Sequence, residues 1–290
     1  MLTVIGSVLG LVLYVPLVLV WCLLYVLTWP WRSRNAVGSP RCVLVTGASS
    51  GIGRSLAVSY AKPGVALALL GRNKNRLQEV SQICKDKGSV VHILDVDVGE
   101  RELLRDSILD FDDKYPIDII IANAGISAGT TQETDGDDQY YAIINTNILG
   151  VLNTVLPIIP RFKSRKRGQV ILMGSQASNL SAFSVSHPYC ASKAALSSLA
   201  ASWRNELKGY KVGVSLITPG FVKTPMTDKN NFDMPLMMDV NTATQIMVDG
   251  ISKDMALISY PLTVTILSWL AHCTPEDLKS TISHFFPQNK

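Results

Sequence analysis

The chain has 290 residues, of which 47% are hydrophobic and only 17% are charged, and its formal net charge is +4. This composition excludes a disordered acidic or basic chain, and the length fits one α/β domain or two small domains. The five cysteines form no CxxC pair and their number is odd, so we expect thiols in a reducing compartment rather than a disulfide scaffold or a zinc module.

Charge is unevenly distributed along the chain. Residues 1–31 carry no charged side chain, and eight Lys or Arg residues precede the first acidic residue, Glu79. The first 78 residues therefore contribute +8 and the remaining residues −4. This distribution is not that of a nucleic-acid-binding protein. It predicts anionic neighbours for the first part of the chain: lipid headgroups beside residues 1–31, and cofactor phosphates further on.

The uncharged segment 1–31 is predicted to be a transmembrane signal anchor, because about 20 apolar residues suffice to cross a bilayer as a helix. Three tryptophans gather toward its end, where indole rings favour the membrane interface. Arg32 and Arg34 follow in a basic linker, residues 32–41, and the positive-inside rule then places the rest of the chain in the cytosol. A cleaved signal peptide is the alternative, but the basic start and the small residues before a cleavage site are missing.

Strands and helices are predicted to alternate through a single domain, residues 42–290. Short apolar runs bounded by turn residues predict strands at 42–46, 65–71, 90–96, 117–123, 169–174 and 212–218. The intervening stretches predict helices at 51–61, 73–87, 100–114, about 137–159, and 188–208. This alternation is typical of a Rossmann-type, doubly wound parallel sheet with helices on both faces.

A glycine-rich turn, residues 46–53 (TGASSGIG), joins the first predicted strand to the first helix. Gly47 and Gly51 permit a tight turn and a close approach of the backbone to a pyrophosphate, and Gly53 lets the helix pack closely on the sheet. The amino end of the helix offers N–H groups and a positive dipole to phosphate. The position of the turn in a βαβ unit predicts a dinucleotide site. Its expected contacts are Gly47, Ser49, Ser50, Gly51, Ile52 and Gly53.

The end of the second predicted strand distinguishes NAD from NADP. An NAD site places an acidic residue there to bind the ribose hydroxyls. This chain has Gly71-Arg72 and no acid. Because an arginine can bind a 2′-phosphate through charge-assisted hydrogen bonds, we predict NADP(H) as the cofactor. The alternative is that Arg72 is simply a solvated residue at the start of a helix.

Two further polar positions follow strands three and four. Asp97 could accept a hydrogen bond from an adenine amino group, and Asn123, in the turn Asn123-Ala124-Gly125, could bind either the loop backbone or the ribose. Both lie at carboxyl ends of predicted parallel strands, where ligands bind in open α/β sheets. Ordinary turn chemistry explains the same residues equally well.

Tyr189 and Lys193 are spaced i, i+4 at the start of a predicted helix, which places phenol and ammonium on one face. A nearby cation lowers the pKa of a phenol from about 10 and suits it to transfer a proton to a ketone oxygen or from an alcohol. Ser175, at the end of strand five, could hydrogen-bond the substrate oxygen. Asn147, on the long helix, could hold a water molecule in a proton path.

These motifs make residues 42–260 resemble the short-chain dehydrogenase/reductase family, in its NADP-preferring "classical" branch. The resemblance implies a sheet of about seven parallel strands and an assembly that is usually a dimer or a tetramer. It implies that Tyr189 is the acid/base, that Ser175 polarises the carbonyl, that Lys193 binds the nicotinamide ribose and lowers the Tyr189 pKa, and that Asn147 supports a water relay. The cofactor contacts that it adds are Gly125, Tyr189, Lys193, Pro219, Gly220, Val222 and Thr224.

The chain departs from the family pattern at three places. Ala122 replaces an asparagine, and Ser50 stands where a basic residue would support NADP, so the NADP preference depends on Arg72 alone. The spacing between Ser175 and Tyr189 is one residue longer than expected, which leaves Ser178 as the fallback for the catalytic serine.

Apolar segments near the carboxyl terminus indicate a lipophilic substrate. Residues 221–240 are expected to be a lid that is rich in methionine, an adaptable side chain, unless these residues simply pack in the core. The apolar segment 255–286 includes 17 uncharged residues, 255–271, expected to form an interfacial helix or one that closes the pocket, rather than a second span. Basic residues in 161–167 could contact anionic headgroups, although a solvated loop is the simpler interpretation.

The sequence therefore predicts a membrane-anchored, NADPH-dependent oxidoreductase that transfers a hydride to a ketone or aldehyde. The anchor and lid resemble those of 3-ketosphinganine reductases and of membrane-bound hydroxysteroid and retinol dehydrogenases, so we expect a long-chain, steroid or retinoid substrate. The catalytic domain would face the cytosol, at the endoplasmic reticulum if the source is eukaryotic. The alternative is a non-catalytic NADP-binding scaffold or sensor of the same fold, which would be expected to lose Tyr189 or Lys193. We expect no metal and no nucleic-acid partner.

Overall fold

The structure is a computed structural model that describes residues 35–128, 136–179, 186–230, 234–275 and 277–279, together with Pro16 and Val20. The chain divides into two units, residues 1–34 and 35–290. The predicted anchor, residues 1–31, lies outside the described residues except for Pro16 and Val20. Residues 276 and 280–286 of the predicted apolar segment lie outside them too.

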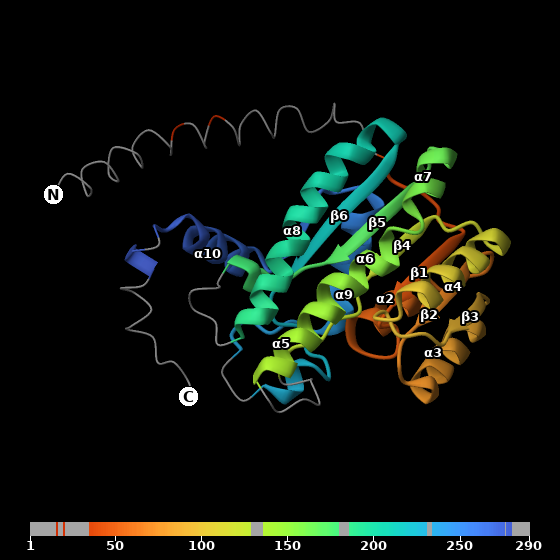
Figure 1. The fold of residues 1–290 in the computed structure, drawn as a ribbon, viewed down its shortest axis with the longest axis horizontal. Helices are drawn as coiled ribbons and strands as arrows, with labels where there is room; N and C mark the ends of the chain where they lie inside the picture. Colours follow the sequence, from red (N-terminus) through yellow and green to blue (C-terminus); the bar gives the residue numbers. More distant parts are fainter. Residues whose placement is uncertain are drawn as a thin grey trace. The chain divides into compact units, whose positions relative to one another are not determined.

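Seven parallel strands form one sheet with the order β3-β2-β1-β4-β5-β6-β7 (Figure 1). Their bounds are β1 Cys42–Thr46, β2 Ala66–Leu70, β3 Val90–Leu94, β4 Ile119–Ala122, β5 Gly168–Met173, β6 Val212–Pro219 and β7 Leu257–Tyr260. Every residue of β1, β2 and β4 is buried, as strands covered on both faces require. The strand order reverses between β1 and β4, which creates a crevice at their carboxyl ends where ligands bind in such folds.

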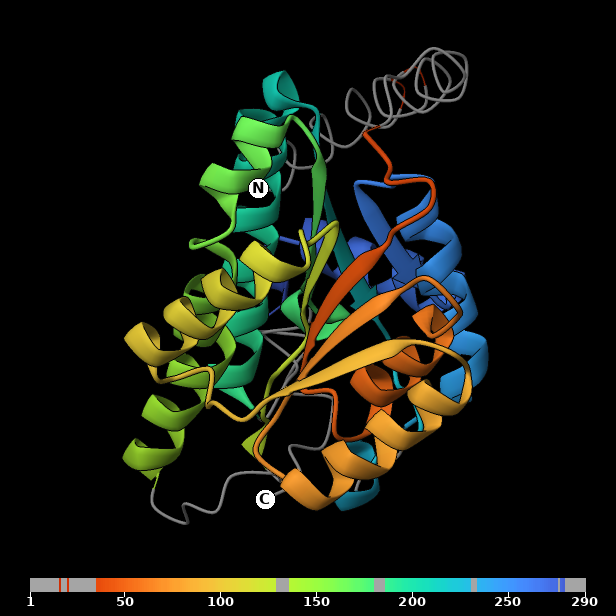
Figure 2. The same cartoon turned by 90° about the vertical axis from the view of Figure 1, so that its right-hand side faces the viewer.

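Helices cover both faces of the sheet, as Figure 2 shows. On one face lie α4 (Arg101–Lys114), α6 (Gly150–Val155), α7 (Ile159–Arg165) and α8 (His187–Leu207). They bury Leu104, Phe162 and Trp203 against the sheet. On the other face α2 (Gly51–Tyr60), α3 (Lys74–Asp86) and α9 (Val240–Ser252) bury Leu56 and Met247. The predicted doubly wound parallel sheet of about seven strands is confirmed.

The helix predicted over about 137–159 is interrupted in the structure. It consists of α5 (Gly136–Ile144), a π-helical turn η3 (Asn145–Leu149) and α6, followed by a turn and α7. Pro157 and Pro160 explain the break, because a proline lacks the N–H that would continue the helical hydrogen bonds. The helical run 136–165 is long and apolar enough to cross a membrane, and its most apolar 18-residue window has a mean hydropathy of 1.7. One side of the run, with Val151, Val155 and Phe162, packs in the core, whereas Leu149 and Leu156 are exposed.

The segment 255–271, expected to be one apolar helix, contains two elements. Strand β7 pairs with β6 in parallel, and α10 (Leu262–Cys273) begins after Pro261. The expectation was wrong because Pro261 separates a strand that completes the sheet from the helix that follows it. Helix α10 presents an apolar surface, with Leu262 70% and Leu267 64% exposed. Helix α9 was not predicted either, although Asp239 caps it by accepting hydrogen bonds from the N–H groups of Asn241 and Thr242.

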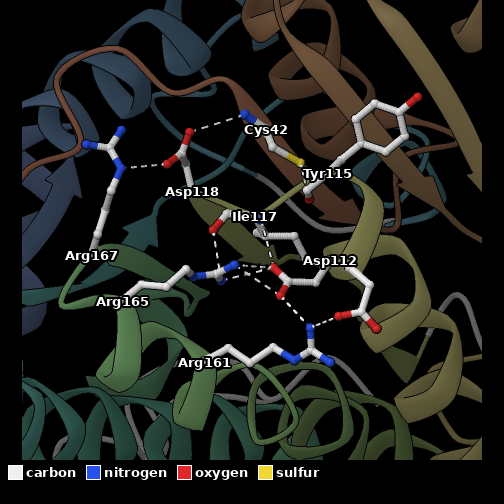
Figure 3. Close-up of polar contacts among 9 residues, drawn as sticks. Cys42, Asp112, Tyr115, Ile117, Asp118, Arg161, Arg165 and Arg167 are labelled. Atoms are coloured by element: carbon white, nitrogen blue, oxygen red, sulfur yellow. Dashed lines mark hydrogen bonds and ion pairs between the residues drawn. The ribbon is translucent and has the colours of Figure 1, made fainter.

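Basic residues in 161–167 pair with carboxylates of the protein rather than remaining available for lipid (Figure 3). Asp112, whose side chain is 1% exposed, accepts two hydrogen bonds from Arg165 at 3.0 Å and one from Arg161 at 3.1 Å. Arg167 donates to Asp118 at 2.8 Å, and Lys163 pairs with Glu206. The preferred interpretation, a solvated loop, is therefore wrong, because these residues lie in and just after α7 and four of the five cations pair with carboxylates. The same ion pairs give no support to the alternative, a contact with anionic headgroups.

We predict that Asp112→Ala lowers the free energy of unfolding by about 2–4 kcal/mol, because it leaves two guanidinium groups without their buried partner. Asp112 also accepts a hydrogen bond from the N–H of Ile117. Thermal or urea unfolding of the full-length protein measures the effect. The control is Asp106→Ala, which breaks an exposed ion pair with Arg105 and should cost less than about 1 kcal/mol. Equal stability of the two variants would contradict the structural role of Asp112.

Candidate active site

A cavity of about 800 Å³ opens at the carboxyl ends of the central strands. All the residues predicted to bind the cofactor line it: Gly47, Ser49, Ser50, Gly51, Ile52, Gly53, Arg72, Asp97, Asn123, Gly125, Tyr189, Lys193, Pro219, Gly220, Val222 and Thr224. Of the predicted catalytic residues, Ser175, Tyr189 and Lys193 line the cavity, and Asn147 does not. The structure thus brings these residues from seven separate segments of the chain to one site.

The glycine-rich turn has the backbone that its sequence predicts. Gly47 and Gly51 have φ angles of 66° and 54°, a left-handed conformation that glycine adopts at little cost. A Cβ at Gly53 would lie 2.2 Å from the carbonyl oxygen of Gly47, so this position admits no side chain. Ser50 occupies the N-cap of α2 without making a capping hydrogen bond. The first turn of α2 therefore keeps backbone N–H donors that a phosphate could bind.

Asn123 supports this turn through its side chain. Its amide donates to the carbonyl oxygen of Thr46 at 2.9 Å and, more weakly, to that of Gly47 at 3.5 Å. The hydroxyl of Thr46 accepts hydrogen bonds from the N–H groups of Asn123 and Ala124, both at 3.0 Å. Of the two roles left open for Asn123, the structure shows binding to the loop backbone.

The part of the cavity lined by Arg72 and Asp97, where the adenosine of a dinucleotide is expected, is more basic than predicted. We call it the adenosine end. Arg76 also lines the cavity, in the first turn of α3, whose N-cap is Asn73. Arg72 precedes the helix and lies 3.9 Å from Asp97, whose other oxygen accepts the N–H of Gly99 at 2.7 Å. Arg76 was missed, although a second arginine in the first turn of the helix after Arg72 was a signal that could have found it.

Ser175 and Tyr189 line the cavity together, close enough for the Ser175 hydroxyl to lower the pKa of the Tyr189 phenol. Ser175 follows β5, and Tyr189 lies in the first turn of α8. The fallback residue, Ser178, does not line the cavity. Its hydroxyl donates to the carbonyl oxygen of Ser175 at 2.8 Å. The longer spacing between Ser175 and Tyr189 therefore leaves the two side chains together.

Lys193 lies beneath this pair and is only 4% exposed. Its Nζ donates to the carbonyl oxygen of Met173 at 2.8 Å and lies 5.5 Å from the centre of the Tyr189 ring. Burial lowers the pKa of Lys193 to about 8, because a buried ammonium loses its hydration. The amine therefore titrates near physiological pH.

The expected lowering of the Tyr189 pKa is not found in the protein alone. Burial raises the pKa of the phenol above its usual value, and this effect outweighs the hydrogen bond with Ser175, which lowers it. The expectation considered only the charge of Lys193 and omitted the loss of hydration that burial imposes on a phenolate. The phenol consequently remains protonated at neutral pH.

Asn147 lies in the π-helical turn, fully buried. Its Oδ1 accepts from the N–H of Ile126 at 2.8 Å, and its Nδ2 donates to the carbonyl oxygen of Ile126 and to the Ser192 hydroxyl, both at 3.0 Å. The side chain thus fixes the segment after Gly125 against α8. A π-helical turn of this kind often marks a functional site.

The two ends of the predicted lid, residues 221–240, are hydrogen-bonded to each other. The N–H of Lys223 donates to the carbonyl oxygen of Met238, and the N–H of Met238 donates to that of Phe221, both at 2.9 Å. Between these points Met226 lines the cavity, whereas Leu236 and Met237 are exposed. Residues 231–233 lie outside the described part of the chain. Leu236 and Met237 therefore do not pack in the core, which was the alternative interpretation of this segment.

The cavity fits a nicotinamide dinucleotide. A phosphate could approach the backbone where Gly47, Gly51 and Gly53 carry no Cβ, and helix α2 supplies the N–H donors. Arg72 and Arg76 would bind phosphate at the adenosine end, and Lys193 the nicotinamide ribose. Among the described residues, no group of three or more His, Cys, Asp or Glu side chains could hold a metal ion.

Comparisons with known proteins agree with this geometry. The sequence profile of the family described as short chain dehydrogenase matches residues 41–235. An uncharacterized oxidoreductase of Myxococcus xanthus is 34% identical over 241 residues, which cover 83% of this chain and 95% of the relative. The 11-beta-hydroxysteroid dehydrogenase 1A of Arabidopsis thaliana is 36% identical over 206 residues, 69% of this chain and 57% of the relative.

Solved structures show the same fold. A short-chain dehydrogenase from Sphingobium yanoikuyae in complex with NADPH is 25% identical, with a TM-score of 0.70 over 86% of this chain and 97% of that protein. A short-chain dehydrogenase/reductase from Burkholderia phymatum in complex with NAD has a TM-score of 0.73 at 20% identity, over 84% of this chain and 96% of that protein. With its glycine turn, its Ser-Tyr-Lys cluster and these relatives, the chain belongs to the short-chain dehydrogenase/reductase family of nicotinamide-dependent oxidoreductases.

Proposed function

We propose that the protein is a membrane-anchored reductase that uses NADPH to reduce a ketone or aldehyde of a lipophilic substrate. The observation that carries the proposal is the convergence of Ser175, Tyr189 and Lys193 on the same cavity as the dinucleotide turn. Each of these side chains has a chemical role at a carbonyl group. A non-catalytic scaffold or sensor would have no need for this arrangement.

The side chains of the site act on the carbonyl oxygen of the substrate. The bound cofactor supplies the hydride. The Ser175 hydroxyl donates a hydrogen bond to the carbonyl oxygen and stabilises the negative charge that develops there. The Tyr189 phenol, kept protonated by burial, donates its proton to this oxygen as a general acid. Lys193 holds the ribose in place, and its positive charge stabilises the phenolate that remains.

The preference for NADPH is inferred from the charges at the adenosine end. Arg72 and Arg76 both line the cavity there, and the strand before them ends without an acidic residue. Asp97, near Arg72, is the one acidic residue in the described lining. Two guanidinium groups complement a 2′-phosphate, whereas an NAD site would use a carboxylate to bind the ribose hydroxyls.

The lipophilic substrate and the membrane anchor are supported by exposed apolar side chains and by the sequence. Leu236 and Met237 of the lid are exposed, and α10 adds exposed Leu267 and Trp269. Helix α10 contains no Asp, Glu, Lys or Arg, and residues 1–31 carry no charge. We propose that residues 1–31 hold the catalytic domain at the cytosolic face of a membrane, the endoplasmic reticulum in a eukaryote, and that α10 contacts its surface.

We predict that Tyr189→Phe lowers turnover by at least about 10²-fold and leaves NADPH binding unchanged, because it removes only the transferred proton. The assay follows NADPH consumption by the full-length protein in lipid vesicles with long-chain ketones, 3-ketosphinganine, steroid ketones and retinal. The control is Tyr210→Phe, a partly exposed tyrosine that contacts Lys163 and does not line the described cavity. Tight NADPH binding without turnover of any substrate would favour the sensor instead.

We predict that Arg72→Ala and Arg76→Ala each raise the Kd for NADPH by roughly tenfold or more, because each removes a charge-assisted hydrogen bond. The Kd for NADH should change less than about twofold, because NADH lacks the 2′-phosphate to which such a bond is made. Nucleotide fluorescence at low salt measures both constants. The control is Lys74→Ala, which removes a nearby cation that pairs with Asp95 and does not line the described cavity. Equal affinities of the wild type for NADH and NADPH would refute the assignment.

We predict that the unfolding free energy of the cofactor-free protein rises between pH 8 and 9.5, relative to that of Lys193→Met. The folded state releases the Lys193 proton near pH 8, whereas the unfolded chain keeps it to about pH 10.4. The unfolded state binds more protons in this window, so the difference should approach about 1.4 kcal/mol per pH unit. Urea unfolding at each pH tests it, and a difference that is independent of pH would contradict the burial of a titrating amine.

A further inference from the structure

Gln176 directly follows Ser175 and opens the short 3₁₀ helix η4 (Gln176–Asn179), yet it does not line the cavity. It is only 3% exposed. Burying an amide is unfavourable unless it is hydrogen-bonded, and here Oε1 is buried with no partner among the residues that the structure describes, so Nε2 carries the side chain's hydrogen bonds. Its Nε2 donates to the Thr265 hydroxyl at 2.9 Å and to the carbonyl oxygen of Tyr260 at 3.0 Å, with the Ser259 hydroxyl at 3.3 Å.

The carbonyl oxygen of Tyr260 has a second donor, the N–H of Gly220, at 2.8 Å. Gly220 belongs to the Pro219-Gly220 turn that lines the cavity. The contact is close, because a Cβ at Gly220 would lie 3.7 Å from Oε1 of Gln176 and 3.4 Å from the Tyr260 oxygen. One carbonyl group at the end of β7 therefore joins the segment that carries Ser175 to the turn at the end of β6.

The segment after Ser175 has few other side-chain anchors. The Ser175 hydroxyl accepts from the N–H of Ala177 at 3.2 Å, and Ser178 donates back to the Ser175 carbonyl, but both bonds are internal to the segment. Among the described residues, Gln176 is the side chain of η4 for which hydrogen bonds to β7 and α10 are found. Thr265 is fixed in turn by hydrogen bonds to Ser259 at 2.8 Å and to the carbonyl oxygen of Pro261 at 3.0 Å.

We propose that Gln176 is a positioning residue, which holds the Ser175 hydroxyl in register with Tyr189 and the Pro219-Gly220 turn by hydrogen-bonding to the end of β7 and the start of α10. The inference rests on the proposed reductase function, because Ser175 must act on a carbonyl for its position to affect the rate. Displacement of a reacting group by about 1 Å is enough to slow a reaction by about 10²-fold.

The test is a double-mutant cycle with Gln176→Met and Ser175→Ala in the full-length protein. Methionine has a similar length and no donor, so the single variant should lower kcat by roughly 10–100-fold, with KM and the Kd for NADPH within about threefold of the wild type. On the Ser175→Ala background the same substitution should change kcat by less than about threefold, because its effect is exerted through the absent hydroxyl.

The matched control is Gln169→Met. Gln169 is another fully buried glutamine, on β5, whose Nε2 donates to the carbonyl oxygen of Ile251 at 2.8 Å, remote from the cavity lining. The Gln169→Met variant should lower the Tm, because it removes a buried hydrogen bond, and should leave kcat unchanged. If Gln176→Met does not fold, Thr265→Val is the second variant. It keeps the shape of the side chain but removes the hydroxyl that accepts from Gln176 Nε2, so it should also lower kcat, by a smaller factor than Gln176→Met.

The outcomes separate the two proposals. Wild-type kcat in Gln176→Met, or the same fold-loss with and without Ser175, overturns the positioning role and leaves the reductase function intact. A wild-type protein that binds NADPH and reduces none of the ketones overturns the proposed function, and the inference with it, because Ser175 then has no carbonyl to act on.

Discussion

No side chain fits between the glycine turn and the first turn of α2, and the rest of the site depends on this constraint. A Cβ at Gly53 would lie 2.2 Å from the Gly47 carbonyl and 2.5 Å from the Asn123 amide. The close approach allows Asn123, at the end of β4, to hydrogen-bond the backbone at the end of β1. The two strands between which the sheet reverses are thereby held together at their carboxyl ends. Helix, turn and neighbouring strand therefore meet closely beside the cavity, with only the Asn123 amide between them.

Burial shifts the pKa values of Tyr189 and Lys193 in opposite directions. Loss of hydration raises the pKa of the Tyr189 phenol, which stays protonated, and lowers the pKa of the Lys193 ammonium. Each group is driven toward its neutral form, but only the phenol is neutral at pH 7, because a pKa of about 8 leaves most of the Lys193 amine protonated. The hydrogen bond with Ser175 favours the phenolate and therefore opposes the effect of burial on Tyr189. A carbonyl substrate that binds at Ser175 would consequently meet a phenol that still holds the proton it has to donate.

The sequence predicts the fold and the cavity lining well because both depend on local patterns. Continuous apolar runs produce β1, β2 and β4, and glycines at fixed spacing produce the turn. The failures involve contacts between segments far apart in the chain. The basic residues near Arg165 look solvated until α4 places Asp112 beside them, and the apolar run around Pro261 looks like one helix until β6 provides a partner for its first half. The raised pKa of Tyr189 and the partners of Gln176 have the same origin, because burial and hydrogen bonding across segments leave no mark on local sequence.

The closed base of the lid has an evolutionary consequence. Phe221 and Lys223 are both hydrogen-bonded to Met238, so the chain between Lys223 and Met238 forms a loop whose two ends already meet. Lengthening a loop with fixed ends adds little entropic cost, about 0.6 kcal/mol for each doubling. Thr227 in this loop donates its hydroxyl to the Val222 carbonyl oxygen at 2.8 Å, and Thr224 and Lys229 line the cavity. Changes in the part of the loop beyond Lys229 can therefore accumulate without loss of these contacts or of the Pro219-Gly220 turn, so related proteins can differ there while the lining around the glycine-rich turn stays the same.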